Sequence, residues 1–280
     1  MTDPQSLSRR GLVAAGAAAL AVGVTGLPAH AATAGRYGGL AGARPTVVLV
    51  HGAFADGSSW SPVIERLQYA GYSVRTLANP LRGLAADAAH VRSVLSTLSE
   101  PVVLAGHSYG GAVITEAAAG ISQVKALVYV SAFVPDAGEI LGELSARFPG
   151  SQLQPALTTV PTTAPDGSQG LDLYIRPEQF QHIFAQDLPE SSARLLASVQ
   201  RPLSASAFTD KTSAAAWRSV PSWNLISTQD RVIAPELQRF QAERAGSRTV
   251  QIASSHLPLR SHPGAVATLI ESAARTVAAR

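Results

Sequence analysis

The chain has 280 residues, of which 46% are hydrophobic and 15% are charged, a composition typical of one globular domain with a sizeable core. It contains no cysteine, which excludes disulfides, thiolate metal sites and a cysteine nucleophile. The formal net charge is +3, but the arginines are scattered singly and no basic run follows the first ten residues. We therefore expect no nucleic-acid partner.

The beginning of the chain has the features of an export signal. Ser8-Arg9-Arg10 precedes a Gly/Ala-rich apolar stretch from Gly11 to Leu27, and Pro28-Ala29-His30-Ala31 follows as a small-x-small cleavage pattern. This resembles a twin-arginine signal. An uncleaved membrane anchor is the alternative, but this stretch barely spans a bilayer. We expect a signal peptide over 1–31, a flexible segment over 32–44, and a secreted or cell-envelope protein without stable membrane association after cleavage.

From Pro45 onward, short strand-like runs alternate with helical patterns. The expected strands cover 46–50, 72–79, 101–106 and 124–133, and the expected helices cover 60–71, 85–98 and the stretch from Tyr109 to Gly120. Such alternation predicts parallel strands joined by crossover helices, hence an α/β sheet covered on both faces. We expect this domain to cover residues 45–280.

The alternation stops between about 136 and 220 and then resumes. This stretch holds a Thr/Pro/Gly-rich loop over 158–170 and amphipathic helices over 176–188 and 191–200; afterwards we expect strands over 222–228 and 248–254 and helices from about 235 to 245 and 263 to 279. A helical insertion between two sheet strands predicts a lid over the strand ends, where open α/β sheets bind ligands.

A candidate nucleophile lies at the end of the third expected strand. Gly106-His107-Ser108-Tyr109-Gly110 matches G-x-S-x-G where a strand must turn sharply into a helix. Side chains at the positions flanking the serine would collide in that turn, so glycine fits there. We expect the hydroxyl of Ser108 to be exposed at the edge of the sheet, and His107 to point away from it.

A serine hydroxyl needs a histidine base and an orienting carboxylate, which follow it in the chain order serine, acid, histidine. His256 comes directly after the last strand and is favoured as the base over His262, which we expect to begin the final helix. Asp230 follows the strand over 222–228 and is favoured as the acid. Asp136, which follows an earlier strand, is the alternative.

The oxyanion of acyl transfer must be met by preorganised donors. We expect these to be the backbone N–H of Tyr109 and that of Ala53, in the loop after the first strand. His51, in the same loop, more simply holds the loop by hydrogen bonds. The other histidines and the aspartates of the insertion, Asp172, Asp187 and Asp210, are expected to have helix-face, solvated or capping roles.

Several segments together resemble one known family. They are VLVHGAFADGSSW, NPLRGLAADAAHVRSVL, VLAGHSYGGAVITEAA, VYVSAFVPDAGE, STQDRVIAPELQRF and SSHLPLRSHPGAVATLI. The chain is similar to the small serine-esterase branch of the α/β-hydrolase superfamily, close to plant-type esterases and hydroxynitrile lyases. The resemblance implies the α/β-hydrolase fold, a Ser108, Asp230 and His256 triad, and oxyanion donors at Ala53 and Tyr109. It says much less about the substrate.

We expect an exported serine hydrolase that cleaves small-molecule carboxylic esters, with no metal and no cofactor. A hydroxynitrile lyase or another non-hydrolytic enzyme on the same triad is the alternative, and a catalytically silent ligand-binding protein is another. In the hydroxynitrile lyases that the chain resembles, a lysine follows the catalytic histidine, whereas Leu257 occupies that position here. The sequence leaves the acyl and alcohol specificity and the oligomeric state open.

Overall fold

The centre of the domain is a parallel sheet, seen in a computed structural model that describes residues 44–163 and 166–279. The sheet has six strands in the order β2-β1-β3-β4-β8-β9, and all its pairings are parallel. Valine, leucine and alanine dominate the inner strands, as burial on both faces requires. The inner strands are β1 (Thr46–Val50), β3 (Val102–His107), β4 (Val124–Val130) and β8 (Ser222–Ser227), and the more exposed edges are β2 (Val74–Leu77) and β9 (Arg248–Ile252).

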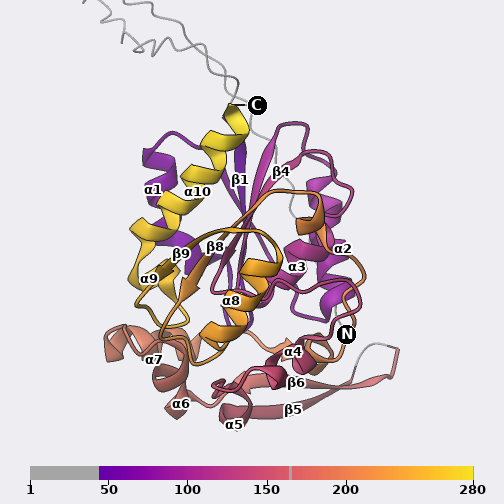
Figure 1. Ribbon diagram of the computed structural model, residues 1–280. Coiled ribbons are helices and arrows are strands. Elements are labelled where there is room, and N and C mark those ends of the chain that lie inside the picture. Colours follow the sequence, from indigo (N-terminus) through magenta and orange to yellow (C-terminus); the bar gives the residue numbers. More distant parts are fainter. Residues whose placement is uncertain (1–43, 164–165, 280) are drawn as a thin grey trace, which may run out of the picture. The chain divides into compact units, whose positions relative to one another are not determined.

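Helices cover both faces of this sheet (Figure 1). On one face lie α1 (Ser61–Tyr69), α9 (Pro258–Ser261) and α10 (Pro263–Ala278); on the other lie α2 (Leu84–Leu95), α3 (Tyr109–Ala117) and α8 (Pro235–Arg244). The alternation of strands and helices predicted from the sequence is confirmed, with boundaries that differ by a few residues. Successive strands carry their functional loops at the same carboxyl edge.

The insertion, residues 136–220, lies at the carboxyl ends of the strands (Figure 1). Its helices are α4 (Leu141–Arg147), α5 (Leu153–Ala156), α6 (Pro177–Phe184) and α7 (Glu190–Ser198), and its strands are β5 (Leu157–Thr163), β6 (Gln169–Ile175) and β7 (Leu203–Ser204). Short 3-10 helices cover Gly57–Trp60 (η1), Ala205–Phe208 (η2) and Ala216–Arg218 (η3).

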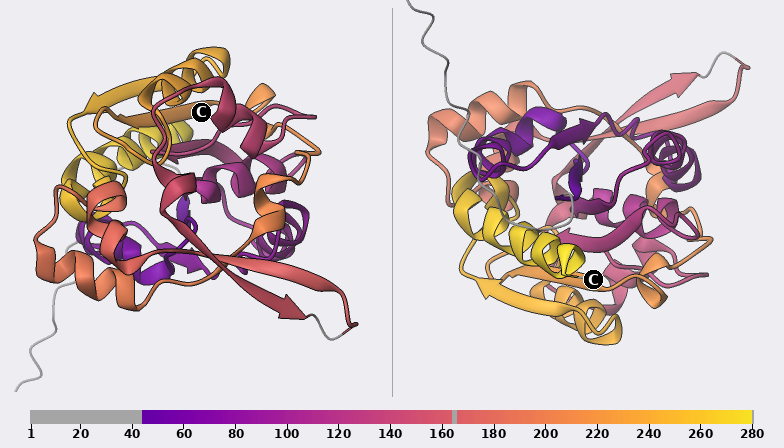
Figure 2. Two further views of the ribbon diagram at one scale, coloured as in Figure 1. Left: turned by 90° about the horizontal axis from the view of Figure 1, so that it is seen from below. Right: turned by 90° about the horizontal axis from the view of Figure 1, so that it is seen from above.

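The expectation of a loop over 158–170 was wrong. β5 and β6 pair antiparallel and form a three-stranded sheet with β7, so the insertion is not purely helical. The paired strands project from the rest of the domain as a long arm (Figure 2). Threonines favour strands because they are β-branched, and Pro161 is tolerated because β5 is an edge strand.

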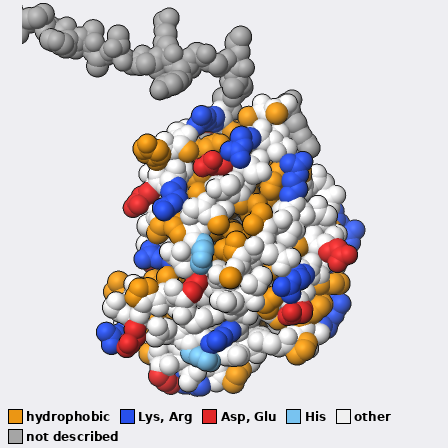
Figure 3. Space-filling model, turned by 60° about the vertical axis from the view of Figure 1, so that its left-hand side comes forward, with side chains coloured by type: hydrophobic (Ala, Val, Ile, Leu, Met, Phe, Trp, Pro, Cys, Tyr) orange, Lys and Arg blue, Asp and Glu red, His pale blue; other side chains and the backbone are white. Residues whose placement is uncertain are grey.

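The surface of the domain carries charges of both signs. On the face in Figure 3, basic and acidic side chains are interspersed among apolar and uncharged ones. Over 44–163 and 166–279, no helix is both long enough and apolar enough to cross a membrane. The predicted signal peptide and the segment after it, up to residue 43, lie outside the described residues.

Candidate active site

Ser108 occupies a strained turn between β3 and α3. Its backbone has φ 54° and ψ −124°, values that side chains rarely tolerate. A Cβ atom on Gly106 would lie 2.5 Å from the carbonyl oxygen of Gly110, and one on Gly110 would lie 2.7 Å from that of His51. Since real Cβ atoms do not approach backbone so closely, both glycines of the G-x-S-x-G motif are required by the local packing.

The loop after β1 packs directly against this turn. A Cβ atom on Gly52 would lie 2.7 Å from the Cβ of Ser108, so the next residue, Ala53, is held beside the serine. Ala53 and Tyr109 are 5% and 3% exposed. Within the described chain, neither backbone N–H donates a hydrogen bond, which leaves both available to an acceptor. The phenol of Tyr109 points elsewhere and donates to Asp87 at 2.7 Å.

His51 holds this loop, as the sequence suggested. Its Nδ1 lies 2.9 Å from the carbonyl oxygen of Gly52, and its Nε2 accepts the backbone N–H of Asn79 at 3.0 Å. Burial lowers the pKa of His51, which keeps the ring neutral and able to accept at one nitrogen and donate at the other.

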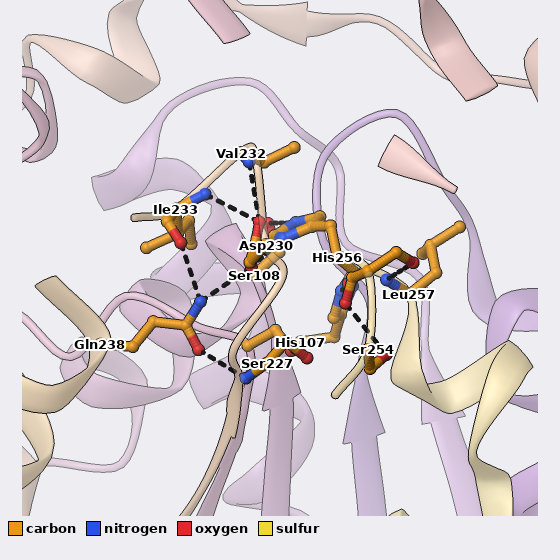
Figure 4. Close-up of polar contacts among 12 residues, drawn as sticks. His107, Ser108, Ser227, Asp230, Val232, Ile233, Gln238, Ser254, His256 and Leu257 are labelled. Carbon is orange, nitrogen blue, oxygen red and sulfur yellow. Dashed lines mark hydrogen bonds and ion pairs between the residues drawn. The ribbon is translucent and has the colours of Figure 1, made fainter. Parts of the chain in front are cut away.

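The structure brings Ser108, His256 and Asp230 into one hydrogen-bonded chain (Figure 4). The hydroxyl of Ser108 lies 2.7 Å from Nε2 of His256, and Nδ1 of His256 lies 2.7 Å from Oδ2 of Asp230. A carboxylate only accepts, so Nδ1 carries the proton and Nε2 is free to accept the hydroxyl proton. Both the imidazole and the carboxylate are fully buried.

The carboxylate of Asp230 accepts four hydrogen bonds in all. Oδ1 accepts the backbone N–H groups of Val232 and Ile233 at 2.7 and 3.0 Å, and Oδ2 accepts the amide of Gln238 at 2.8 Å as well as His256 (Figure 4). Gln238 was missed by the sequence analysis, since a glutamine inside a helix carries no motif. These donors hold the carboxylate in one orientation, and no lysine or arginine of the described residues forms an ion pair with it.

His107 contacts His256 through both its ring and the carbonyl oxygen of His256. Its Nε2–H donates to the carbonyl oxygen of His256 at 2.8 Å, and the two ring centroids lie 4.9 Å apart. Burial, together with the nearby His256, holds the pKa of His107 well below its usual value. His107 therefore stays neutral and anchors the loop that carries His256.

The alternative candidates have other partners. The carboxylate of Asp136 accepts two hydrogen bonds from the guanidinium of Arg218, and these hydrogen bonds lower the pKa of Asp136. His262 precedes α10, as predicted, and its ring lies 2.9 Å from the hydroxyl of Ser261. In this structure neither Asp136 nor His262 joins the hydrogen-bonded chain from Ser108.

A small apolar pocket adjoins the site. Phe54 and Leu257, which line it, follow Ala53 and His256 in the chain; Phe184, from α6, packs 4.9 Å from the ring of His256. The lining residues are Phe54, Ala55, Asp56, Ser58, Ser59, Phe180, Phe184, Leu196, Val199, Leu257 and Arg260. The insertion thus forms one wall of this pocket. Among the described residues, no cluster of three or more His, Asp or Glu side chains is arranged to hold a metal ion.

Comparisons with known proteins agree with this architecture. The chain matches the Alpha/beta hydrolase family over residues 47–269. It is 36% identical over 125 residues to a carbendazim hydrolyzing esterase of Nocardioides sp. (strain SG-4G), a match covering 37% of this chain and 52% of that protein. It is 28% identical over 257 residues to salicylic acid-binding protein 2 of Nicotiana tabacum, covering 81% of this chain and 96% of the relative.

A solved structure shows the same fold. The crystal structure of polyneuridine aldehyde esterase matches with a TM-score of 0.70 and 21% identity, over 82% of this chain and 99% of that one. The protein belongs to the α/β hydrolase family. The resemblance inferred from the sequence is therefore confirmed.

Proposed function

We propose that this protein hydrolyses carboxylic esters of small molecules through an acyl-enzyme formed on Ser108. The observation that carries the proposal is the hydrogen-bonded chain from Ser108 through His256 to Asp230, with 2.7 Å at both steps. A serine hydroxyl becomes a useful nucleophile only when a base takes its proton, and a base within hydrogen-bond distance does so.

In the first half of the reaction, Oγ of Ser108 attacks the ester carbonyl while its proton passes to Nε2 of His256. The resulting imidazolium forms an ion pair with Asp230. His256 then gives the proton to the departing alkoxide oxygen, and the alcohol leaves an acyl group on Ser108. In the second half, His256 removes a proton from water, the hydroxide attacks the acyl carbon, and the proton returns to Oγ as the carboxylic acid leaves.

Each half passes through a tetrahedral intermediate with a negative oxygen. The backbone N–H groups of Ala53 and Tyr109 stabilise that oxygen in this proposal. The support for this role is that Tyr109 follows Ser108 in the chain and Ala53 follows Gly52, which packs against Ser108. Both residues are buried, and neither N–H has another acceptor within the described chain. Donors that are already oriented need no rearrangement as the charge develops.

The residue after His256 favours hydrolysis over cyanide elimination. Leu257 is 2% exposed and apolar, so it cannot compensate the negative charge of a departing cyanide. Hydrolysis needs no such cation, because the leaving alkoxide is protonated by His256. No cyanide release from mandelonitrile above the buffer rate is expected.

Covalent labelling tests the nucleophile. A fluorophosphonate probe should label the wild type, and Ser108→Ala should abolish both labelling and hydrolysis of p-nitrophenyl esters, because removing a triad nucleophile costs several powers of ten in rate. Retention of even about a tenth of wild-type turnover by Ser108→Ala would contradict the assignment.

We also propose export through the leader, supported by Arg9-Arg10, the apolar stretch after them and the small-x-small pattern that ends at Ala31. N-terminal sequencing of the exported protein should begin near Ala32. Replacing Arg9 and Arg10 with lysine should trap the precursor inside the cell. Full-length protein in the membrane fraction would favour an uncleaved anchor instead.

A further inference from the structure

The end of α6 and the turn after it touch both loops that carry the proposed acid and base. We call residues 182–187 the strap. On one side, the guanidinium of Arg231 donates to the carbonyl oxygen of His182 at 2.8 Å, and the amide of Gln186 donates to the carbonyl oxygen of Gln229 at 2.6 Å. The residues immediately before and after Asp230 are therefore both tied to the insertion.

On the other side, the strap holds the loop that carries His256. Oδ2 of Asp187 accepts the backbone N–H of Ser255 at 2.9 Å and lies 3.2 Å from the hydroxyl of Ser254. Both serines are fully buried, and Asp187 is only 18% exposed at its side chain. The expectation that Asp187 has a solvated or capping role was wrong, because its partners lie 67 and 68 positions later in the chain.

A third strap residue contacts the base itself. The ring centroid of Phe184 lies 4.9 Å from that of His256, and the ring of His107 lies at the same distance. The carbonyl oxygen of His256 is held by His107 from the sheet, whereas the residue before it is held by Asp187 from the insertion. His256 is thus positioned from two independent parts of the fold.

We propose that Asp187 is a positioning residue for the reaction, acting through Ser255 to hold the imidazole of His256 against Ser108. The inference rests on the proposed function of the triad and adds a role for the insertion in it. Ser255 is joined directly to His256, so a shift of its backbone displaces the imidazole. Because Nε2 and Nδ1 each have a partner at 2.7 Å, such a displacement lengthens at least one of these hydrogen bonds.

Burial alone would raise the pKa of Asp187, but the hydrogen bonds donated by Ser255, Ser261 and Ser254 together outweigh burial, and the pKa lies below its usual value. The group is therefore a carboxylate at neutral pH, and a charged acceptor makes a stronger hydrogen bond to an N–H than a neutral one does. Asparagine at this position retains an acceptor oxygen, whereas alanine retains none. Comparing Asp187→Ala with Asp187→Asn therefore distinguishes the loss of the hydrogen bond from the loss of the charge.

The test compares Asp187→Ala, Asp187→Asn and the control Asp136→Ala, whose side chain is also 18% exposed but whose carboxylate contacts Arg218. Steady-state kinetics with p-nitrophenyl acetate should show kcat lowered roughly ten- to a hundredfold in Asp187→Ala, with KM little changed, because a misplaced group costs rate rather than binding. Asp187→Asn should recover most of the loss, and Asp136→Ala should match the wild type.

The second readout does not depend on turnover. The proton on Nδ1 of His256, hydrogen-bonded to Asp230, should give a resolved downfield NMR resonance, which His256→Ala assigns by its loss. Asp187→Ala should broaden or remove this resonance, and Asp136→Ala should retain it. If the wild type hydrolyses no ester, the proposed function fails while the NMR comparison still decides the role of Asp187.

An unchanged resonance together with unchanged kcat in Asp187→Ala overturns the inference. Equal losses of kcat and of the resonance in Asp187→Ala and Asp136→Ala also overturn the inference, because they indicate general destabilisation. If Asp187→Ala does not fold, Asp187→Ser replaces it in both measurements, since its shorter side chain also withdraws the acceptor from the N–H of Ser255. In that case a wild-type resonance and a wild-type kcat in folded Asp187→Ser contradict the role of Asp187.

Discussion

Gln238 offers a sharp test of how the proposed acid is held. This fully buried residue on α8 joins three groups: its amide nitrogen lies 2.8 Å from Oδ2 of Asp230 and 2.8 Å from the carbonyl oxygen of Ile233, and its Oε1 accepts the N–H of Ser227 at 3.2 Å. Gln238→Leu keeps a similar volume and removes all three hydrogen bonds.

The loss of unfolding free energy in Gln238→Leu can be estimated from the polar groups that lose a hydrogen-bond partner. A buried polar group left without its partner costs about 1–3 kcal/mol. In Gln238→Leu, Asp230 keeps its three other hydrogen-bond donors, and the N–H of Ser227 loses only a long hydrogen bond. Costs near the lower end of this range therefore apply to both groups. The sum is about 3–5 kcal/mol, and for a domain of this size it corresponds to a fall in Tm of roughly 6–20 °C. Turnover should also fall about tenfold, because the carboxylate that orients His256 is less firmly held.

The assay compares Gln238→Leu with Gln241→Leu by thermal unfolding and by kcat of the folded protein. Gln241 is one turn further along α8, is also fully buried, and accepts the N–H of Val134 at 2.7 Å without touching Asp230. Gln241→Leu should lower Tm but leave kcat within about twofold, since only the folded fraction changes. Equal losses of Tm with kcat unchanged in both variants would refute the idea that Gln238 orients the acid.

Asp230→Asn should lower kcat by roughly four powers of ten without unfolding the protein, because the imidazole loses its correct tautomer; Asp136→Asn should be mild, and the reverse ranking would assign the acid to Asp136. Hydrogen bonds from Ser255, Ser261 and Ser254 lower the pKa of Asp187 against the effect of burial. The stabilising contribution of Asp187 is therefore present above the pKa of an unfolded aspartate and is lost as pH falls through the lowered value. The difference in unfolding free energy between wild type and Asp187→Ala should therefore shrink at acidic pH, and a difference that grows there would contradict this sign.

The parts of the site that could be predicted from the sequence are those that a local pattern determines. Ser108 could be found because an apolar strand, flanking glycines and a following helix lie within ten residues of one another. His256 and Asp230 could be chosen because parallel strands end at one edge of the sheet, so residues just after two such strands meet there. Their hydrogen bonds with each other are consistent with that choice.

The parts that were missed depend on contacts between distant segments. Gln238 and Asp187 have ordinary neighbours in the sequence, and only packing brings Asp187 against Ser255. The arm of β5 and β6 was missed for a related reason: its strands are stabilised by pairing with each other, while threonine, proline and glycine in one stretch equally fit a loop. Tertiary pairing outweighed the local turn signals.

The charges around Ser108, His256 and Asp230 suit the proposed transfer of one proton. The carboxylate of Asp230 is surrounded by N–H donors and forms its only ion pair, within the described residues, with His256. A nearby arginine would already neutralise this carboxylate and weaken its attraction for an imidazolium. His107 adds no competing positive charge, because burial and the proximity of His256 hold its pKa well below the usual value. The surroundings therefore favour placing the positive charge on His256, at the moment when the proposed reaction transfers the proton from Ser108.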